Sequence, residues 1–220
     1  MRPRTKSLLL IAAMIIPAMA FTFGGWAVVT ADDVPEYAVA GSAFDLTYTV
    51  RQHGQTPRGD LAGSVALSAG GRAMSVKSTA LGEGVYRARL NFPQPGTWSV
   101  RVNSGWGGVG GEMLPLKVIA ANAPVPAPLS PFERGHQLYL AKGCATCHSH
   151  AATKDVESVR QGPDLTEPKF AASYLARFLA DPSIKKDWKS EARMPNLALK
   201  PAEVTALVAF LNQEKRTAAR

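Results

Sequence analysis

The chain has 220 residues, of which 46% are hydrophobic and 19% charged, with 25 basic against 17 acidic side chains and two cysteines. This composition excludes a wholly disordered chain, and two cysteines exclude a disulfide-dense scaffold and a four-cysteine zinc module. The net charge of +8 would suit nucleic acid, but no basic stretch is interleaved with aromatic residues, so we expect no nucleic-acid partner. The excess of basic side chains forms either a solvated face or a docking face for an acidic redox partner.

Residues 1–20 have the pattern of a secretory signal peptide. Basic residues precede an uncharged, mostly apolar run, which ends in the small-x-small sequence Ala18-Met19-Ala20. The alternative is a retained membrane anchor over residues 7–29. Two observations disfavour it: Gly24-Gly25 would lie in the interior of the membrane helix, and the pattern of residues 26–30 is more typical of a strand. Both interpretations predict export, to the periplasm or the extracytoplasmic membrane face. Contact with the membrane is expected only if this segment is retained.

Residues 21–120 alternate between apolar and polar side chains. Phe44, Leu46, Tyr48 and Val50 share one face of a run whose other face is polar, and glycines and prolines separate this run from similar ones. The pattern predicts roughly seven short antiparallel strands in an immunoglobulin-like (Ig-like) β-sandwich. Similar runs lie at 86–90, 98–102 and 116–118.

The predicted sandwich offers little chemistry. His53 is a candidate copper ligand together with Met74 or Met113, although a lone histidine in a loop is usually no ligand at all. No nucleophile has a base beside it in the sequence. The more favoured interpretation is that this domain docks the protein to a larger complex.

Residues 121–131 form a joint that is rich in proline and alanine and carries no charge, which predicts a semi-rigid spacer. Beyond it, residues 132–220 change to helical periodicity. The first predicted helix ends at Gly143, and the last begins at Pro201 and places apolar residues at helical spacing up to Leu211. A third helix is predicted over 171–181 and is stopped by the following proline. The whole chain is therefore expected to hold two domains, all-β and then all-α.

Both cysteines lie in the sequence Cys144-Ala145-Thr146-Cys147-His148, which is the C-x-x-C-H attachment motif of c-type haem. Two thiols at this spacing can form thioethers with the two vinyl groups of one porphyrin, and the adjacent histidine then lies below the iron. A thioredoxin-like redox pair would need a βαβ context, and a zinc site would need further ligands. The motif thus predicts one covalently bound haem c.

The region from residue 131 to about 214 resembles the class I (monohaem) c-type cytochromes. Segments similar to the family's first helix, its G-P-x-L loop, its distal methionine loop and its closing helix occur in the family's order. These segments are Gly135 to Gly143, Gly162-Pro163-Asp164-Leu165, Arg193-Met194-Pro195-Asn196 and Leu207 to Leu211. The resemblance implies that Cys144 and Cys147 form the thioethers, that His148 is the proximal ligand and that Met194 is the distal ligand.

The resemblance also implies that the carbonyl group of Pro163 accepts a hydrogen bond from the His148 ring, and that Trp188, Lys189 and Arg193 lie where the family often contacts haem propionates. Met194 is the single methionine of the helical domain in the mature chain, and a polar loop is an unusual place for a methionine that only fills a core. His136 and His150 are the rival sixth ligands.

Histidine–methionine ligation would close the iron to other ligands and favour one-electron transfer. We therefore expect an electron carrier, not itself an enzyme, whose partners are redox proteins or a membrane complex. The alternatives are a haem-bearing subunit of a larger redox enzyme or of a respiratory or photosynthetic complex, a haem sensor, and a copper-handling protein.

Overall fold

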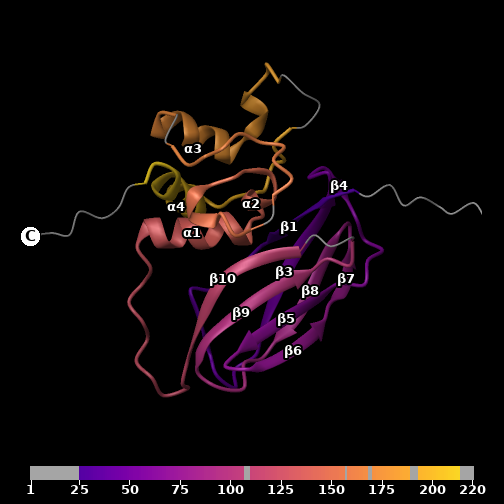
Figure 1. The fold of residues 1–220 in the computed structure, drawn as a ribbon, viewed down its shortest axis with the longest axis vertical. Helices are drawn as coiled ribbons and strands as arrows, with labels where there is room; N and C mark the ends of the chain where they lie inside the picture. The colour runs from indigo at the N-terminus through magenta and orange to yellow at the C-terminus, as the bar shows by residue number, and fades with distance from the viewer. Residues whose placement is uncertain (1–24, 107–109, 157, 168–169, 189–192, 214–220) are drawn as a thin grey trace, which may run out of the picture.

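The computed structural model describes residues 25–106, 110–156, 158–167, 170–188 and 193–213. All its strands precede all its helices, and the helices gather on one side of the strands (Figure 1). The predicted order, an all-β part followed by an all-α part, is confirmed. Within the described ranges no helix is long and apolar enough to span a membrane. The predicted signal peptide and all of the alternative anchor but residues 25–29 lie outside the described residues.

The sandwich contains two five-stranded sheets. One has the order β1-β3-β8-β7, with β4 paired to the end of β3, and the other has the order β2-β10-β9-β5-β6. The described residues form more strands than the roughly seven predicted. Strands such as β2 and β4 contain only three and two residues, so their sequences show no alternating pattern. The strands are β1 Ala27–Ala31, β2 Tyr37–Val39, β3 Phe44–Gln52, β4 Thr56–Pro57, β5 Ser64–Ala69, β6 Arg72–Lys77, β7 Thr79–Gly82, β8 Val85–Leu90, β9 Gly96–Asn103 and β10 Gly110–Ile119.

The core of the sandwich lies between the two sheets and is rich in aromatic side chains. Tyr48 and Tyr86 stack with ring centroids 5.5 Å apart, and Phe92 meets Trp98 edge-on at 5.4 Å. All four side chains are fully buried. Leu46, Tyr48 and Val50 of the predicted apolar face of β3 are buried, and Phe44 is partly buried, but Thr49 of the polar face is buried as well.

The helices are α1 Pro131–Ala141, α2 Cys144–Cys147, α3 Ala172–Ala180 and α4 Pro201–Leu211, with single 3₁₀ turns at Ala151–Thr153 and Pro182–Ile184. Helix α1 begins at Pro131, where Ser130 and Glu133 form a reciprocal capping box. It packs against α4 so closely that a Cβ atom at Gly135 would lie 2.0 Å from the carbonyl oxygen of Ala206. Glycine is therefore required at this helix crossing.

The helical domain is packed directly against the sandwich. All five residues of β1 are buried, whereas a strand with one solvent-facing side would alternate. Ala27, Val29 and Ala31 face the sandwich core, which is joined by Ala141 from the end of α1. The intervening Val28 and Thr30 therefore lie on the face that the helical domain covers. The proline-rich joint thus connects two domains that are in contact.

Candidate haem-binding site

The helical domain contains a cavity of about 380 Å³, and the five residues predicted from the sequence to bind haem all line it: Cys144, Cys147, His148, Pro163 and Met194. Most of the remaining wall is apolar. It comes from α3, from the end of α4 and from the segment around Met194, and includes Tyr174, Leu175, Phe178, Leu179, Leu207 and Leu211.

The two cysteines are carried on the single turn of α2. Gly143 precedes this turn with φ of 77°, and a Cβ atom there would lie 2.5 Å from the carbonyl oxygen of Val29, so both conformation and space require glycine. Neither thiol is in a disulfide. Burial raises the pKa of the Cys144 thiol to about 12 and that of Cys147 to about 11, so both are protonated at neutral pH unless they are alkylated.

The His148 ring is fixed by hydrogen bonding and by close packing. Its Nδ1 atom lies 2.9 Å from the carbonyl oxygen of Pro163. A carbonyl oxygen can only accept, so Nδ1–H is the donor, and the neutral ring keeps its lone pair on Nε2. Burial lowers the pKa of His148, which favours this neutral ring. A Cβ atom at Gly162 would lie 2.2 Å from the ring, so the loop before Pro163 can tolerate no side chain there.

Tyr139 supports the same segment from α1. Its hydroxyl group donates to the carbonyl oxygen of His148 at 3.0 Å, and its ring lines the cavity. From the sequence, Tyr139 belongs to the first predicted helix, within the segment Gly135 to Gly143, and has no predicted role at the site. A tyrosine in place of phenylalanine at an apolar helix position was the available signal, because a buried hydroxyl group needs a partner.

The residues predicted to contact propionates are only partly described. Trp188 and Arg193 line the cavity beside Met194, and Lys189 lies outside the described residues. Trp188 and Arg193 also line a second cleft of about 490 Å³, which adjoins the cavity. Arg51 of the sandwich and Lys185 of the helical domain line the same cleft. The polar end of the site therefore lies where the two domains meet.

The two rival histidine ligands are packed elsewhere. The His136 ring stacks on Phe210 with centroids 4.9 Å apart, and the His150 ring lies 4.5 Å from the same phenylalanine. Neither is among the residues that line the cavity. The Nδ1 atom of His150 accepts from the backbone N–H of Ala152 at 3.1 Å. Their placement favours Met194 as the sixth ligand.

The two methionines that are candidate copper ligands in the sandwich do not come together. Met74 and Met113 lie in line across one sheet, with the paired residues of β5 and β9 between them. Three strand spacings separate the two residues by about 14 Å. His53 lies in the turn after β3, with its ring 5.5 Å from that of Trp26. Among the described residues no cluster of three histidine, cysteine or acidic side chains could hold a metal ion.

The residues of the cavity fit a covalently bound haem. The cavity presents two thiols, an oriented imidazole group and a thioether within apolar walls, which is a donor set of soft and borderline ligands suited to haem iron. Trp26 and Val28 of the sandwich complete the wall. No pattern in the sequence indicated that residues so far from the motif would line the site.

One family model matches the helical region of the chain. Residues 132–215 match the family model Cytochrome c. Among curated proteins no sequence matches the chain.

Several solved structures resemble part of the chain. The Lin-41 filamin domain has 10% identity and a TM-score of 0.36, and the match covers 42% of this chain and 91% of that one. An α-2-macroglobulin from E. coli has 17% identity and a TM-score of 0.35, over 48% of this chain and 7% of that one. Domains 4 and 5 of the S-layer protein SbsC have 15% identity and a TM-score of 0.30, over 44% and 54% of the two chains.

The match over residues 132–215 covers the helices and both cysteines that line the cavity. The region after the proline-rich joint is a cytochrome c domain, which transfers electrons by means of haem c and is joined here to an all-β sandwich.

Proposed function

We propose that this protein is an electron carrier that acts outside the cytoplasmic membrane, with one haem c held by Cys144 and Cys147 and with His148 and Met194 as its axial ligands. The observation that carries the proposal is that these four residues line one cavity. The haem supplies a one-electron couple between ferrous and ferric iron. Ligands on both faces leave no position for a substrate.

The protein residues orient and shield this couple. The Pro163 carbonyl group holds the His148 ring in the tautomer whose Nε2 atom is free to ligate, and it makes the ring a stronger donor. The thioether of Met194 is a soft ligand that stabilises ferrous iron and so raises the reduction potential. The apolar walls exclude water, which acts in the same direction because they disfavour the extra charge of the ferric state.

The location and the partners are part of the proposal. The pattern of residues 1–20 supports export, which places the protein in the periplasm or on the extracytoplasmic face of the membrane. The net positive charge supports acidic redox proteins, free or within a membrane complex, as donor and acceptor. As part of such a complex the protein would feed or drain a catalytic centre on another chain.

Replacing the proposed distal ligand tests this function. In Met194→Ala the weak red absorption band of a ferric thioether–iron bond should disappear, the potential should fall, and the ferrous protein should bind carbon monoxide readily. The haem should stay attached, since Cys144 and Cys147 are unchanged. Met74→Ala is the control, because that side chain is exposed on β6, and it should leave all three properties unchanged.

The wild-type protein decides between a carrier and a sensor. A carrier with a closed iron should bind carbon monoxide slowly at neutral pH. Rapid binding by the wild type, with no thioether band, would contradict the proposal and favour the haem sensor.

A further inference from the structure

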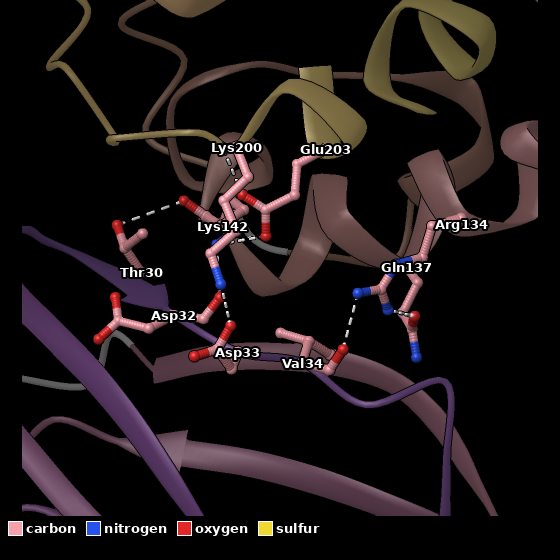
Figure 2. A network of polar contacts seen from close by, with 9 residues as sticks. All are labelled: Thr30, Asp32, Asp33, Val34, Arg134, Gln137, Lys142, Lys200 and Glu203. Atoms are coloured by element: carbon pink, nitrogen blue, oxygen red, sulfur yellow. Dashed lines mark hydrogen bonds and ion pairs between the residues drawn. The ribbon is translucent and has the colours of Figure 1, made fainter. Parts of the chain in front are cut away.

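A buried ion pair joins the haem-binding motif to the sandwich. Lys142, two residues before Cys144, has its Nζ atom 2.9 Å from Oε1 of Glu203, and the two side chains are only 3% and 8% exposed. The same Nζ atom donates to the carbonyl oxygen of Asp32 at 2.7 Å (Figure 2). One ammonium group thus ties α4 and the segment after β1 to the end of α1.

Further hydrogen bonds extend this junction along α1. The guanidinium group of Arg134 donates to the carbonyl oxygen of Val34 at 2.7 Å, and the amide group of Gln137 donates to that of Pro35 at 3.1 Å. Lys200 pairs with Asp33 at the other end of the network (Figure 2). Four successive residues of the sandwich, 32–35, are therefore held by side chains of the helical domain, which fixes the position of β1 immediately before them.

Strand β1 closes one side of the haem cavity. The residue before the strand, Trp26, and Val28 within it both line the cavity. A Cβ atom on Gly143, next to Cys144, would lie 2.8 Å from Cγ1 of Val28, so the strand and the start of α2 are in close contact. The sandwich therefore excludes water from a side of the cavity that the helical domain leaves open.

A second part of the sandwich contacts the loop that carries Met194. In the turn between β3 and β4, the amide group of Gln55 donates to the carbonyl oxygen of Arg193 at 3.4 Å. A Cβ atom on Gly54 would lie 3.6 Å from Cγ of Pro195, so this turn packs on the other neighbour of the methionine. The residues on both sides of Met194 are thus in contact with one turn of the sandwich.

We propose that the sandwich is a structural part of the haem site: Trp26 and Val28 exclude water from the haem, and the turn at Gly54 and Gln55 positions the Met194 loop. The sandwich then helps to set the reduction potential and to keep the distal ligand on the iron. This inference rests on the proposed function, because it takes Met194 to be the distal ligand. Trp26 and Gln55 are positioning residues and do not bind iron.

Two variants of the full chain with haem attached test the proposal. Trp26→Ala should admit water to the cavity and lower the reduction potential, because water stabilises the extra charge of ferric iron. Gln55→Ala should weaken the red thioether band and raise the rate of carbon monoxide binding by up to about fivefold, the factor that one hydrogen bond supplies. The potential and the spectrum respond to the haem environment and not to folding alone.

Matched controls lie at the far end of the sandwich. Phe44→Ala removes an aromatic side chain from the opposite end of β3, where it stacks on Phe92. Gln94→Ala removes an amide group from the turn between β8 and β9, and this turn follows Leu90, the residue of β8 that pairs with Phe44. Both controls should leave the potential, the band and the carbon monoxide rate at wild-type values.

The outcomes separate this inference from the proposed function. Suppose that the wild type shows the thioether band and that neither Trp26→Ala nor Gln55→Ala alters the reduction potential or the rate of carbon monoxide binding. This result would overturn the role of the sandwich and leave the electron carrier intact. Equal shifts in the controls would also overturn it. A wild type without the band would contradict the proposed function itself.

Discussion

The two domains complete their cores in different ways. In the sandwich the large side chains fill the space between the sheets, and their polar atoms find partners: Tyr48 donates to Ser78, Tyr86 to the carbonyl oxygen of Arg58, and Trp98 to that of Gln94. In the helical domain α1 packs closely against α4, and α3 lines a cavity of about 380 Å³. The sandwich core is filled almost entirely by its own side chains, with Ala141 as an addition from α1, whereas the helical domain keeps a cavity that fits the haem.

The largest expected effect comes from removing both thioethers. Without haem, an apolar cavity of about 380 Å³ loses the packing that fills it, which should strongly lower the stability of the helical domain. In the double variant Cys144→Ser/Cys147→Ser we expect acidic acetone to extract the haem. In the same variant without haem, amide hydrogen exchange in α1, α3 and α4 should be faster than in the wild type.

The sandwich should behave differently in this variant. Amides of β5 and β9 should keep their protection, because that core does not include the haem. If these strands lost protection together with the helices, the two domains would fold as one unit, and the contrast between their cores would be wrong.

The second prediction breaks the junction between the domains. Lys142→Met leaves the carboxylate group of Glu203 buried without its cation, which should lower the free energy of unfolding by about 3–5 kcal/mol. Adding Glu203→Gln should restore most of this loss, because the amide oxygen can still accept from the backbone N–H of Lys200. Urea denaturation of the single and double variants measures both effects. A loss below about 1 kcal/mol in the single variant would mean that the ion pair does not hold the junction.

The smallest expected effect concerns the exposed pair at the edge of the same network. The hydrogen bond from Lys200 lowers the pKa of Asp33. A lowered pKa in the folded state adds stability above the unfolded value of about 3.9, and this contribution is lost as the pH falls through the lower folded value. Asp33→Asn should therefore reduce the acid dependence of the urea midpoint slightly, and added salt should reduce the difference from wild type. A steeper acid dependence in the variant would contradict this sign.

Much of the site could be predicted because its chemistry is local. The motif at Cys144 to His148 and the loop at Met194 each occupy a few consecutive residues, and the cavity brings them together. The contact between the domains could not be predicted, since a lysine such as Lys142 is normally exposed and its partners are remote in the sequence. One signal was available: Val28 and Val29 are consecutive apolar residues in a predicted strand, which indicates burial of both faces.

The burial of both faces of β1 has a consequence for moving the helical domain to another protein without the sandwich. The hydrogen bond from Lys142 to Asp32 spans 110 residues, with strands β2 to β10 between its two ends in the sequence. A chain that emerges from its N-terminus therefore presents Val28 and its neighbours long before the cysteines arrive. Transferring residues 132–215 to another partner would carry the complete binding motif but leave one wall of the haem cavity behind.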